Sequence, residues 1–244
     1  MSSFTLKIIA IITMLIDHLK DGIFQDYYVL NIIGRIAFPL FAFQVAVGYK
    51  NTKNVKKYMG RMLLFALISE VPYYLFIQKF ADGQLWCNVM FTLLFGLLTM
   101  YIWDYKPNKK EEKSNEKVNS LMKSFYWILK IYLIAILCFI AEALKFDYGG
   151  LGVLFVLSIH LLFRDGRKWI FAIYYLLYCI AEFREPLIYY KNMKAIPYII
   201  FMYIPIIFML LHNGKKGPSM KYFFYLFYPI HLTIILLISS LIGT

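Results

Sequence analysis

A lysine and a histidine near the start of the chain have the spacing of two groups that act on one long ligand. Lys7 and His18 are eleven residues apart in the apolar run LKIIAIITMLIDHL. In an α-helix this makes three turns with about 20° left over, so the side chains share one face, roughly 16 Å apart along the axis. A cation in line with an imidazole suits a ligand that has an anionic head and a reactive tail. The plain alternative is a snorkelling lysine and an unrelated histidine, and spacing alone does not decide between them.

The neighbouring carboxylate is not placed to assist this histidine. Asp17 directly precedes His18, so on a helix the two side chains point about 100° apart. Asp17 therefore cannot orient the imidazole as a triad carboxylate does, and we expect it to contact Arg35 or a neighbouring helix. The four histidines are far apart in the sequence and show no metal-ligand spacing, so no metal site is predicted.

The composition places these residues in a membrane protein. Of the 244 residues, 61% are hydrophobic and 16% are charged, whereas soluble chains have about 45–50% and about 25%. These values exclude a soluble globular enzyme, a disordered tail and a disulfide-rich secreted module. The net charge of +12 could suggest nucleic acid, but the basic residues concentrate in short loops between apolar runs, as cytoplasmic loops do. The predicted partner is the lipid bilayer, and no nucleic acid is expected.

Nine apolar segments have the composition of transmembrane helices, which need about 20 mostly apolar residues. The sequence therefore predicts an all-α, polytopic membrane helix bundle that forms a single domain over residues 1–244. Because two segments are short, the expected number of spans is eight to ten. The nine segments are residues 4–24, 28–49, 58–78, 86–103, 124–143, 148–163, 168–183, 195–212 and 222–242.

Counts of Lys and Arg predict the orientation of the bundle. Four alternate loops (50–61, 104–123, 164–168 and 213–221), together with Lys7, carry 18 of the 26 basic residues, and the opposite side carries six. The positive-inside rule places the larger set, and with it the N-terminus, in the cytoplasm. We therefore expect a multi-pass protein of the plasma or inner membrane. Residues 104–121 are polar and are predicted to form a solvated cytoplasmic linker loop.

Polar side chains inside the spans gather at one predicted depth. A charged side chain in a bilayer costs roughly 2.5–3.5 kcal/mol, so each needs a reason. Structural ion pairs, such as Arg35 with Glu70 or Asp17, would explain single members. For the whole set, with two histidines that suit proton transfer, we favour a functional cavity in the outer half of the membrane. The set comprises Asp17, His18, Arg35, Glu70, Asn88, Glu142, Asp147 with Tyr148, Glu182 and His231, while His160 and His212 lie toward the inner side and are interpreted as structural.

Two backbone features accompany the polar set. Pro39 lacks an N–H group and should free a carbonyl beside Arg35. The outer loop DYGGLG, from Asp147 to Gly152, either presents backbone N–H groups to an oxyanion or makes a tight turn. The turn is slightly favoured.

Six segments of the chain together resemble the TraX family of integral-membrane proteins. They run in order from the first predicted span to the last, and they read LKIIAIITMLIDH, GRIAFPLFAFQVAVGYKNTKNVKKY, ISEVPYYL, CNVMFTLLFGLL, FDYGGLGVL and FYPIHL. The founding activity of that family is N-terminal acetylation of conjugative pilin. The family is also similar to a larger group of membrane acyltransferases that modify sugars, in which a basic residue precedes a histidine by eleven positions. The resemblance therefore implies an acyltransferase that uses acetyl-CoA.

The resemblance also implies roles for the residues that match the family. His18 would be the catalytic base or a transient acyl carrier. Lys7 would hold the phosphates of acetyl-CoA. Beyond the resemblance, we hypothesise that the basic loop 50–61, with Lys53, Lys57 and Arg61, shares that task.

The other matching residues would support the transfer step. Arg35 or Asn88 would stabilise the developing oxyanion, as fixed donors in a dry site do. Glu70 or His231 would relay the proton. Asp17 and Asp147 also match positions typical of the family.

The acceptor does not follow from the resemblance. An amine or hydroxyl, such as a peptide N-terminus or a glycan, would enter from the outer side.

A proton-coupled transporter would use the same intramembrane cluster and would move ions or substrate without an acyl donor. A non-catalytic scaffold for pilus or envelope assembly would tolerate apolar replacements of the cluster. The oligomeric state is not predicted.

Overall fold

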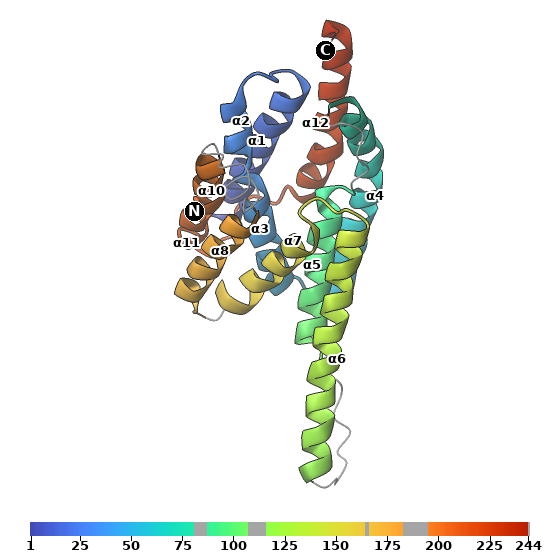
Figure 1. The fold of residues 1–244 in the computed structure, drawn as a ribbon, viewed down its shortest axis with the longest axis vertical. Helices are drawn as coiled ribbons and strands as arrows, with labels where there is room; N and C mark the ends of the chain where they lie inside the picture. The colour runs from blue at the N-terminus through green and yellow to red at the C-terminus, as the bar shows by residue number, and fades with distance from the viewer. Residues whose placement is uncertain (81–86, 107–115, 164–165, 183–194, 244) are drawn as a thin grey trace.

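The computed structural model describes residues 1–80, 87–106, 116–163, 166–182 and 195–243, and within these ranges the fold is all-α. Most of the helices pack into one bundle, and one long helix projects from it (Figure 1). The helices are α1 (Ser3–Gly22), α2 (Tyr28–Gly34), α3 (Ala37–Asn51), α4 (Val55–Phe80), α5 (Val89–Asp104), the projecting α6 (Glu116–Ala143), α7 (Gly149–Ser158), the π-helix η1 (Ile159–Phe163), α8 (Lys168–Glu182), α10 (Ala195–Tyr203), α11 (Pro205–Leu210) and α12 (Lys221–Ile242).

Each of the nine predicted spans coincides with one helix or with two consecutive helices. Four helical segments are long and apolar enough to cross a membrane, and four further apolar helical segments are shorter. α1 is the ninth segment, and its 20 residues include Lys7, Asp17, Lys20 and Asp21. The fold is therefore a membrane helix bundle and the chain a multi-pass membrane protein. The four long segments are Val29–Asn51, Val55–Phe80, Met122–Ala143 and Tyr222–Ile242.

The outer surface of the bundle is apolar, as expected of helices that face lipid. On α6 the side chains of Phe125, Ile131 and Phe139 are each at least 60% exposed. In water such a surface would be unfavourable, whereas in a bilayer it contacts hydrocarbon at no cost.

The structure corrects three predicted boundaries. The predicted span 28–49 is interrupted at Arg35 and Ile36, where the backbone N–H groups bond three residues back instead of four. Pro39 explains the break, because the carbonyl of Arg35 has no helical N–H partner four residues later. Pro205 divides the predicted span 195–212 in the same way. The predicted linker 104–121 is shorter than expected, because α6 already begins at Glu116, while residues 107–115 lie outside the described ranges.

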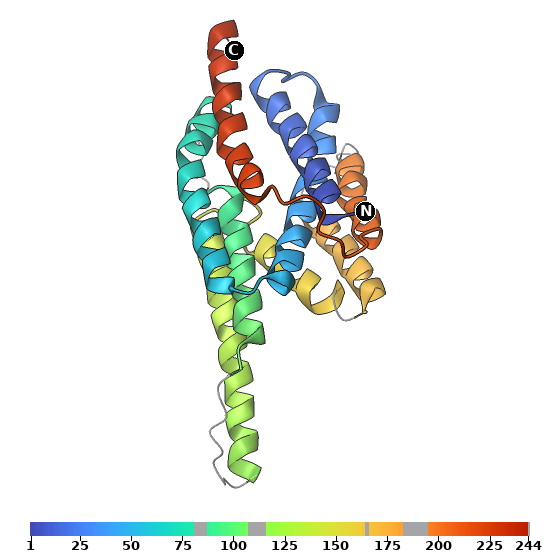
Figure 2. The ribbon, with the colours of Figure 1, turned by 180° about the vertical axis from the view of Figure 1, so that it is seen from behind.

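Three helices that are distant in the sequence run side by side in the same direction. α1 contacts α4 and α12, and α4 packs along α12. Their C-terminal ends point to one end of the bundle, as Figure 2 shows for the blue, teal and red helices. The polar residues in the C-terminal halves of these helices are thereby brought to similar heights.

The loop DYGGLG forms a tight turn whose N–H groups are engaged by the protein itself. Tyr148 and Gly149 have left-handed φ angles of 68° and 50°, and α7 begins directly after Tyr148. The N–H of Gly150 donates to the carboxylate of Glu142 at 2.9 Å. The anion at this helix start is therefore Glu142, which supports the interpretation of the loop as a turn.

His160 and His212 have structural partners. Nε2 of His160 lies 3.1 Å from Oδ1 of Asp104, and the imidazole is buried. His212 lies in the loop that follows α11, and its Nε2 is 2.9 Å from Oγ of Ser3. Burial lowers the pKa of His212, and the N-terminal ammonium group lowers it further. Both contacts join distant segments and lie away from the outer polar cluster.

Candidate functional site

His18 on α1 and His231 on α12 form a hydrogen-bonded pair. Nδ1 of His18 lies 2.6 Å from Nε2 of His231, and the rings stack with centroids 4.9 Å apart. Phe76 on α4 meets the His18 ring edge-on at 5.3 Å, and Tyr228 on α12 lies 6.2 Å from it. His231 is only 4% exposed. The packing of α1, α4 and α12 thus places two imidazoles in a confined aromatic environment.

The hydrogen bonds of His231 determine which nitrogen of His18 carries a proton. Nδ1 of His231 lies 2.7 Å from the carbonyl oxygen of Phe227, which can only accept, so this nitrogen is the donor. With both rings neutral, Nε2 of His231 is then an acceptor, and Nδ1–H of His18 donates to it. Nε2 of His18 is left without a proton. A general base or a nucleophile requires this state.

If His18 is the base that the family resemblance implies, the substitution His231→Phe should impair its reaction. Phenylalanine keeps an aromatic ring in place but offers no acceptor to Nδ1 of His18, so the other tautomer becomes accessible. In that case the expected result is a fall in kcat of about tenfold, an unchanged KM for the substrate and a shifted pH profile of kcat. Steady-state kinetics across pH would check this. An unchanged pH profile would mean that His231 only fills space.

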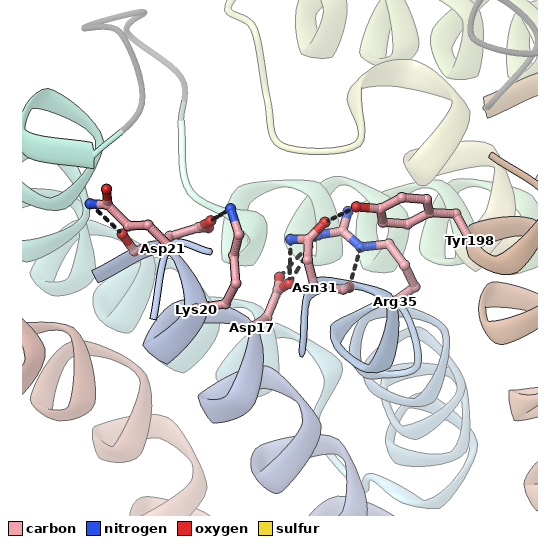
Figure 3. A network of polar contacts seen from close by, with 7 residues as sticks. Asp17, Lys20, Asp21, Asn31, Arg35 and Tyr198 are labelled. Atoms are coloured by element: carbon pink, nitrogen blue, oxygen red, sulfur yellow. Dashed lines mark hydrogen bonds and ion pairs between the residues drawn. The ribbon is translucent and has the colours of Figure 1, made fainter. Parts of the chain in front are cut away.

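Asp17 is held by a network that does not involve His18. Arg35 donates through Nη2 to both oxygens of Asp17, at 3.2 and 3.1 Å, and through Nε to the carbonyl of Asn31 at 3.3 Å. Nδ2 of Asn31 donates to Asp17, and Oδ1 of Asn31 accepts from the hydroxyl of Tyr198, both at 2.7 Å. Figure 3 shows the four side chains converging from α1, α2, the turn after α2, and α10. The predicted contact between Asp17 and Arg35 is confirmed.

The approach of α2 to this ion pair requires a glycine. A Cβ atom at Gly34 would lie 2.2 Å from Oδ1 of Asp17. Any residue other than glycine at this position would therefore displace the carboxylate. Lys20 and Asp21 form a separate ion pair at 3.0 Å, near the end of α1 (Figure 3).

Glu70 on α4 pairs with Asn88 at the start of α5. Nδ2 of Asn88 donates to Oε2 of Glu70 at 2.5 Å and to the carbonyl of Ala66 at 2.9 Å. Oδ1 of Asn88 accepts from the N–H of Met90 at 3.0 Å and so caps α5. The amide of Asn88 therefore joins two helices. Glu70 has this partner in place of the alternative pairing with Arg35.

Asp147 connects these groups electrostatically. Its backbone N–H donates to the carbonyl of Cys87 at 2.9 Å. Its charge acts on Arg35 and also on Tyr73 and Tyr228, which the charge of Glu70 reaches as well. The charge of Arg35 in turn acts on His18. Hydrogen bonds thus join these residues in pairs, and the charges of Arg35 and Asp147 link the pairs into one cluster: Asp17 with Arg35, His18 with His231, and Glu70 with Asn88.

A cavity of about 400 Å³ leads toward this region from the end of the bundle where α1 begins. Along α1 its lining runs from Ser3 through Lys7 to Met14, a rise of about 16 Å. Met14 lies one turn before His18. Tyr228, which also lines the cavity, lies beside both imidazoles.

The predicted donor-binding residues divide into two groups. Lys7 and Arg61 line the cavity, as does Lys216 from the loop before α12. Lys53 and Lys57 are exposed on the neighbouring α3–α4 connection and at the start of α4, and they are not part of the lining. They can raise the local positive potential but do not contact the cavity.

Sequence reasoning missed three polar residues of this region. Asn31 and Tyr198 complete the network around Asp17, and Gln44 lines the cavity. Gln44 has a signal in the sequence, because an amide in the apolar run FAFQVAVG needs a partner inside a membrane span. Across the ranges that the structure describes, no group of three His, Cys, Asp or Glu residues could hold a metal ion.

Fold and site together define a multi-pass helical membrane protein with a hydrogen-bonded histidine pair and a cavity whose lining includes basic residues. The chain belongs to the TraX family, whose family model, described as TraX protein, matches residues 2–239. It is also similar to the probable fimbrial assembly protein FimC, serogroup H1, of Dichelobacter nodosus. The two are 30% identical over 256 residues, which cover 96% of this chain and 94% of that protein. No solved structure matches the chain.

Proposed function

We propose that the protein is an acyltransferase that moves an acetyl group from cytoplasmic acetyl-CoA to an amine or hydroxyl at the outer side of the membrane. The observation that carries this proposal is the pair of His18 and His231. It presents an unprotonated imidazole nitrogen one helical turn beyond a cavity lined by Lys7 and Arg61. A base beyond the end of the cavity that lies opposite Lys7 can react with the tail of a ligand whose anionic head binds Lys7.

The transfer balances with His18 as the base. Nε2 of His18 accepts the proton of the acceptor N–H or O–H as that atom attacks the thioester carbonyl. The C–S bond then breaks, and the proton passes from His18 to the leaving thiolate, which gives the acetylated acceptor and free CoA. In the two-step form, Nε2 itself attacks the thioester carbonyl, and the C–S bond breaks to release the CoA thiolate. The acceptor then attacks the acetyl-imidazolium, the imidazole leaves, and the proton of the acceptor passes to the thiolate.

The hydrogen bonds favour Arg35 over Asn88 as the group that stabilises the oxyanion. The amide of Asn88 is engaged by Glu70, Ala66 and Met90. Arg35 has five N–H donors and directs those of Nε and Nη2 to Asn31 and Asp17. Its charge also lies within range of His18.

The relative named as a fimbrial assembly protein supports a peptide acceptor. A subunit of a surface fibre has an N-terminal amine, and it reaches the outer face of the plasma or inner membrane before assembly. The positive-inside rule places the N-terminus of the present chain in the cytoplasm, where the cavity lined by Lys7 would open to CoA. We therefore propose a fibre-subunit N-terminus as the first acceptor to test.

Binding and slow hydrolysis of acetyl-CoA by the purified protein in lipid nanodiscs provide the test. The wild type is expected to bind and hydrolyse acetyl-CoA, and Lys7→Ala is expected to bind it more weakly because the phosphates lose a cation. A folded wild type without affinity for acetyl-CoA or related acyl donors would contradict the proposal. Flux through liposomes without an acyl donor would instead support a transporter.

A further inference from the structure

Gln44 is a buried amide in the wall of the cavity. It lies on α3, lines the cavity and is only 6% exposed. Its Nε2 has no hydrogen-bond partner within the described part of the chain. A buried donor without an acceptor costs free energy, so such a group in a cavity wall points to a ligand that accepts from it.

Arg61 supplies a second donor of the same kind. Nε of Arg61 is buried and has no partner among the described residues, although this side chain also lines the cavity. Other atoms of the guanidinium group have partners: it interacts with the hydroxyl of Tyr225 and lies 5.9 Å from the Tyr58 ring. The side chain is therefore held in place while Nε remains available.

Much of the remaining lining is apolar, which favours a mostly apolar chain as the ligand. Phe41, Val45, Met62 and Leu93 form apolar walls. A sugar would leave many of its hydroxyl groups without partners against these walls. A bare phosphate would not use the apolar length of about 16 Å along α1, and a hydrocarbon chain would leave both donors unsatisfied.

A pantetheine arm has the chemistry that these walls require. It is an extended chain with two amide carbonyls that accept hydrogen bonds, a phosphate at one end and a thioester at the other. With its phosphate near Lys7, Arg61 and Lys216, its thioester would reach Met14 and Tyr228, next to His18.

We propose that the cavity binds the pantetheine arm of the acyl donor and that Gln44 donates to one of its amide carbonyls, with Arg61 as the second donor. This inference rests on the proposed acyltransferase function. It assigns donor recognition to Gln44, which is a binding residue and takes no part in the proton transfer. The same arm occurs in free CoA and in the prosthetic group of acyl carrier proteins, so either could be the source.

The test compares Gln44→Leu with wild type in binding acetyl-CoA and acetyl-pantetheine. Leucine removes the amide from the apolar wall, so the variant is expected to fold and insert normally. Its affinity is expected to fall about tenfold for both compounds, as for the loss of one buried hydrogen bond. Gln25→Leu is the matched control, because Gln25 lies outside the cavity and donates to the carbonyl of Asp21.

The outcomes separate this inference from the proposed function. If wild type transfers acetyl groups and Gln44→Leu binds both compounds as wild type does, the role of Gln44 is wrong while the enzyme assignment stands. If wild type binds acetyl-CoA but has no affinity for acetyl-pantetheine, the cavity does not hold the arm. Turnover with acetyl-CoA compared with an acetylated carrier protein identifies the source, and Gln44→Leu should impair both by a similar factor.

Discussion

The variant His18→Gln is expected to transfer acetyl groups about 10²–10⁴-fold more slowly than wild type, which is the usual contribution of a general base. Glutamine has a similar length and can still donate to Nε2 of His231, so the packing between α1 and α12 should persist. It has no nitrogen that can accept a proton or carry an acetyl group. Affinity for acetyl-CoA should therefore change little, and the loss should appear in kcat.

Single-turnover assays with acetyl-CoA and an acceptor peptide would measure this effect. His160→Gln is the matched control, because His160 is a buried histidine with a polar partner, Asp104, but lies away from the cluster. We expect its kcat to stay close to that of wild type. Full turnover by a correctly inserted His18→Gln variant would remove His18 from the mechanism.

The variant Arg35→Met is expected to lower the free energy of unfolding by about 3 kcal/mol. The cause is the carboxylate of Asp17, which would remain within the bundle without its cation. The side chains of Arg35 and Asp17 are only 23% and 18% exposed, so solvent cannot compensate for the loss. Thermal unfolding in detergent would report the change as a lower Tm.

A double-mutant cycle separates the ion pair from general packing. Adding Asp17→Asn to Arg35→Met removes the unpaired charge, so the double variant should recover much of the lost stability. If the losses of stability from the two single substitutions add in the double variant, the interaction between Asp17 and Arg35 contributes no stability. In either case we expect acetyl transfer to remain low, because the oxyanion has lost its proposed cation.

The helices and the alignment of Lys7 with His18 could be predicted because they depend on local properties. Hydropathy over about 20 residues located the nine segments, and the helical period alone placed Lys7 and His18 on one face. The same period showed that Asp17 and His18 diverge, which the bond between Asp17 and Arg35 confirmed. The family resemblance followed from the motifs along the whole chain and was confirmed over residues 2–239.

The partners of the polar residues were decided only by the tertiary structure. The sequence placed His231 and His18 at one depth, but depth does not tell which helices are neighbours or how each is rotated. Glu70 could equally have met Arg35, and the choice of Asn88 depends on how α4 packs against the start of α5. The sequence marks Gln44 only as an amide within an apolar run, whereas the missing acceptor of its Nε2 in the cavity wall is a property of the tertiary structure. Such contacts depend on the lateral packing of all the helices together, whereas hydropathy and helical period describe each helix by itself.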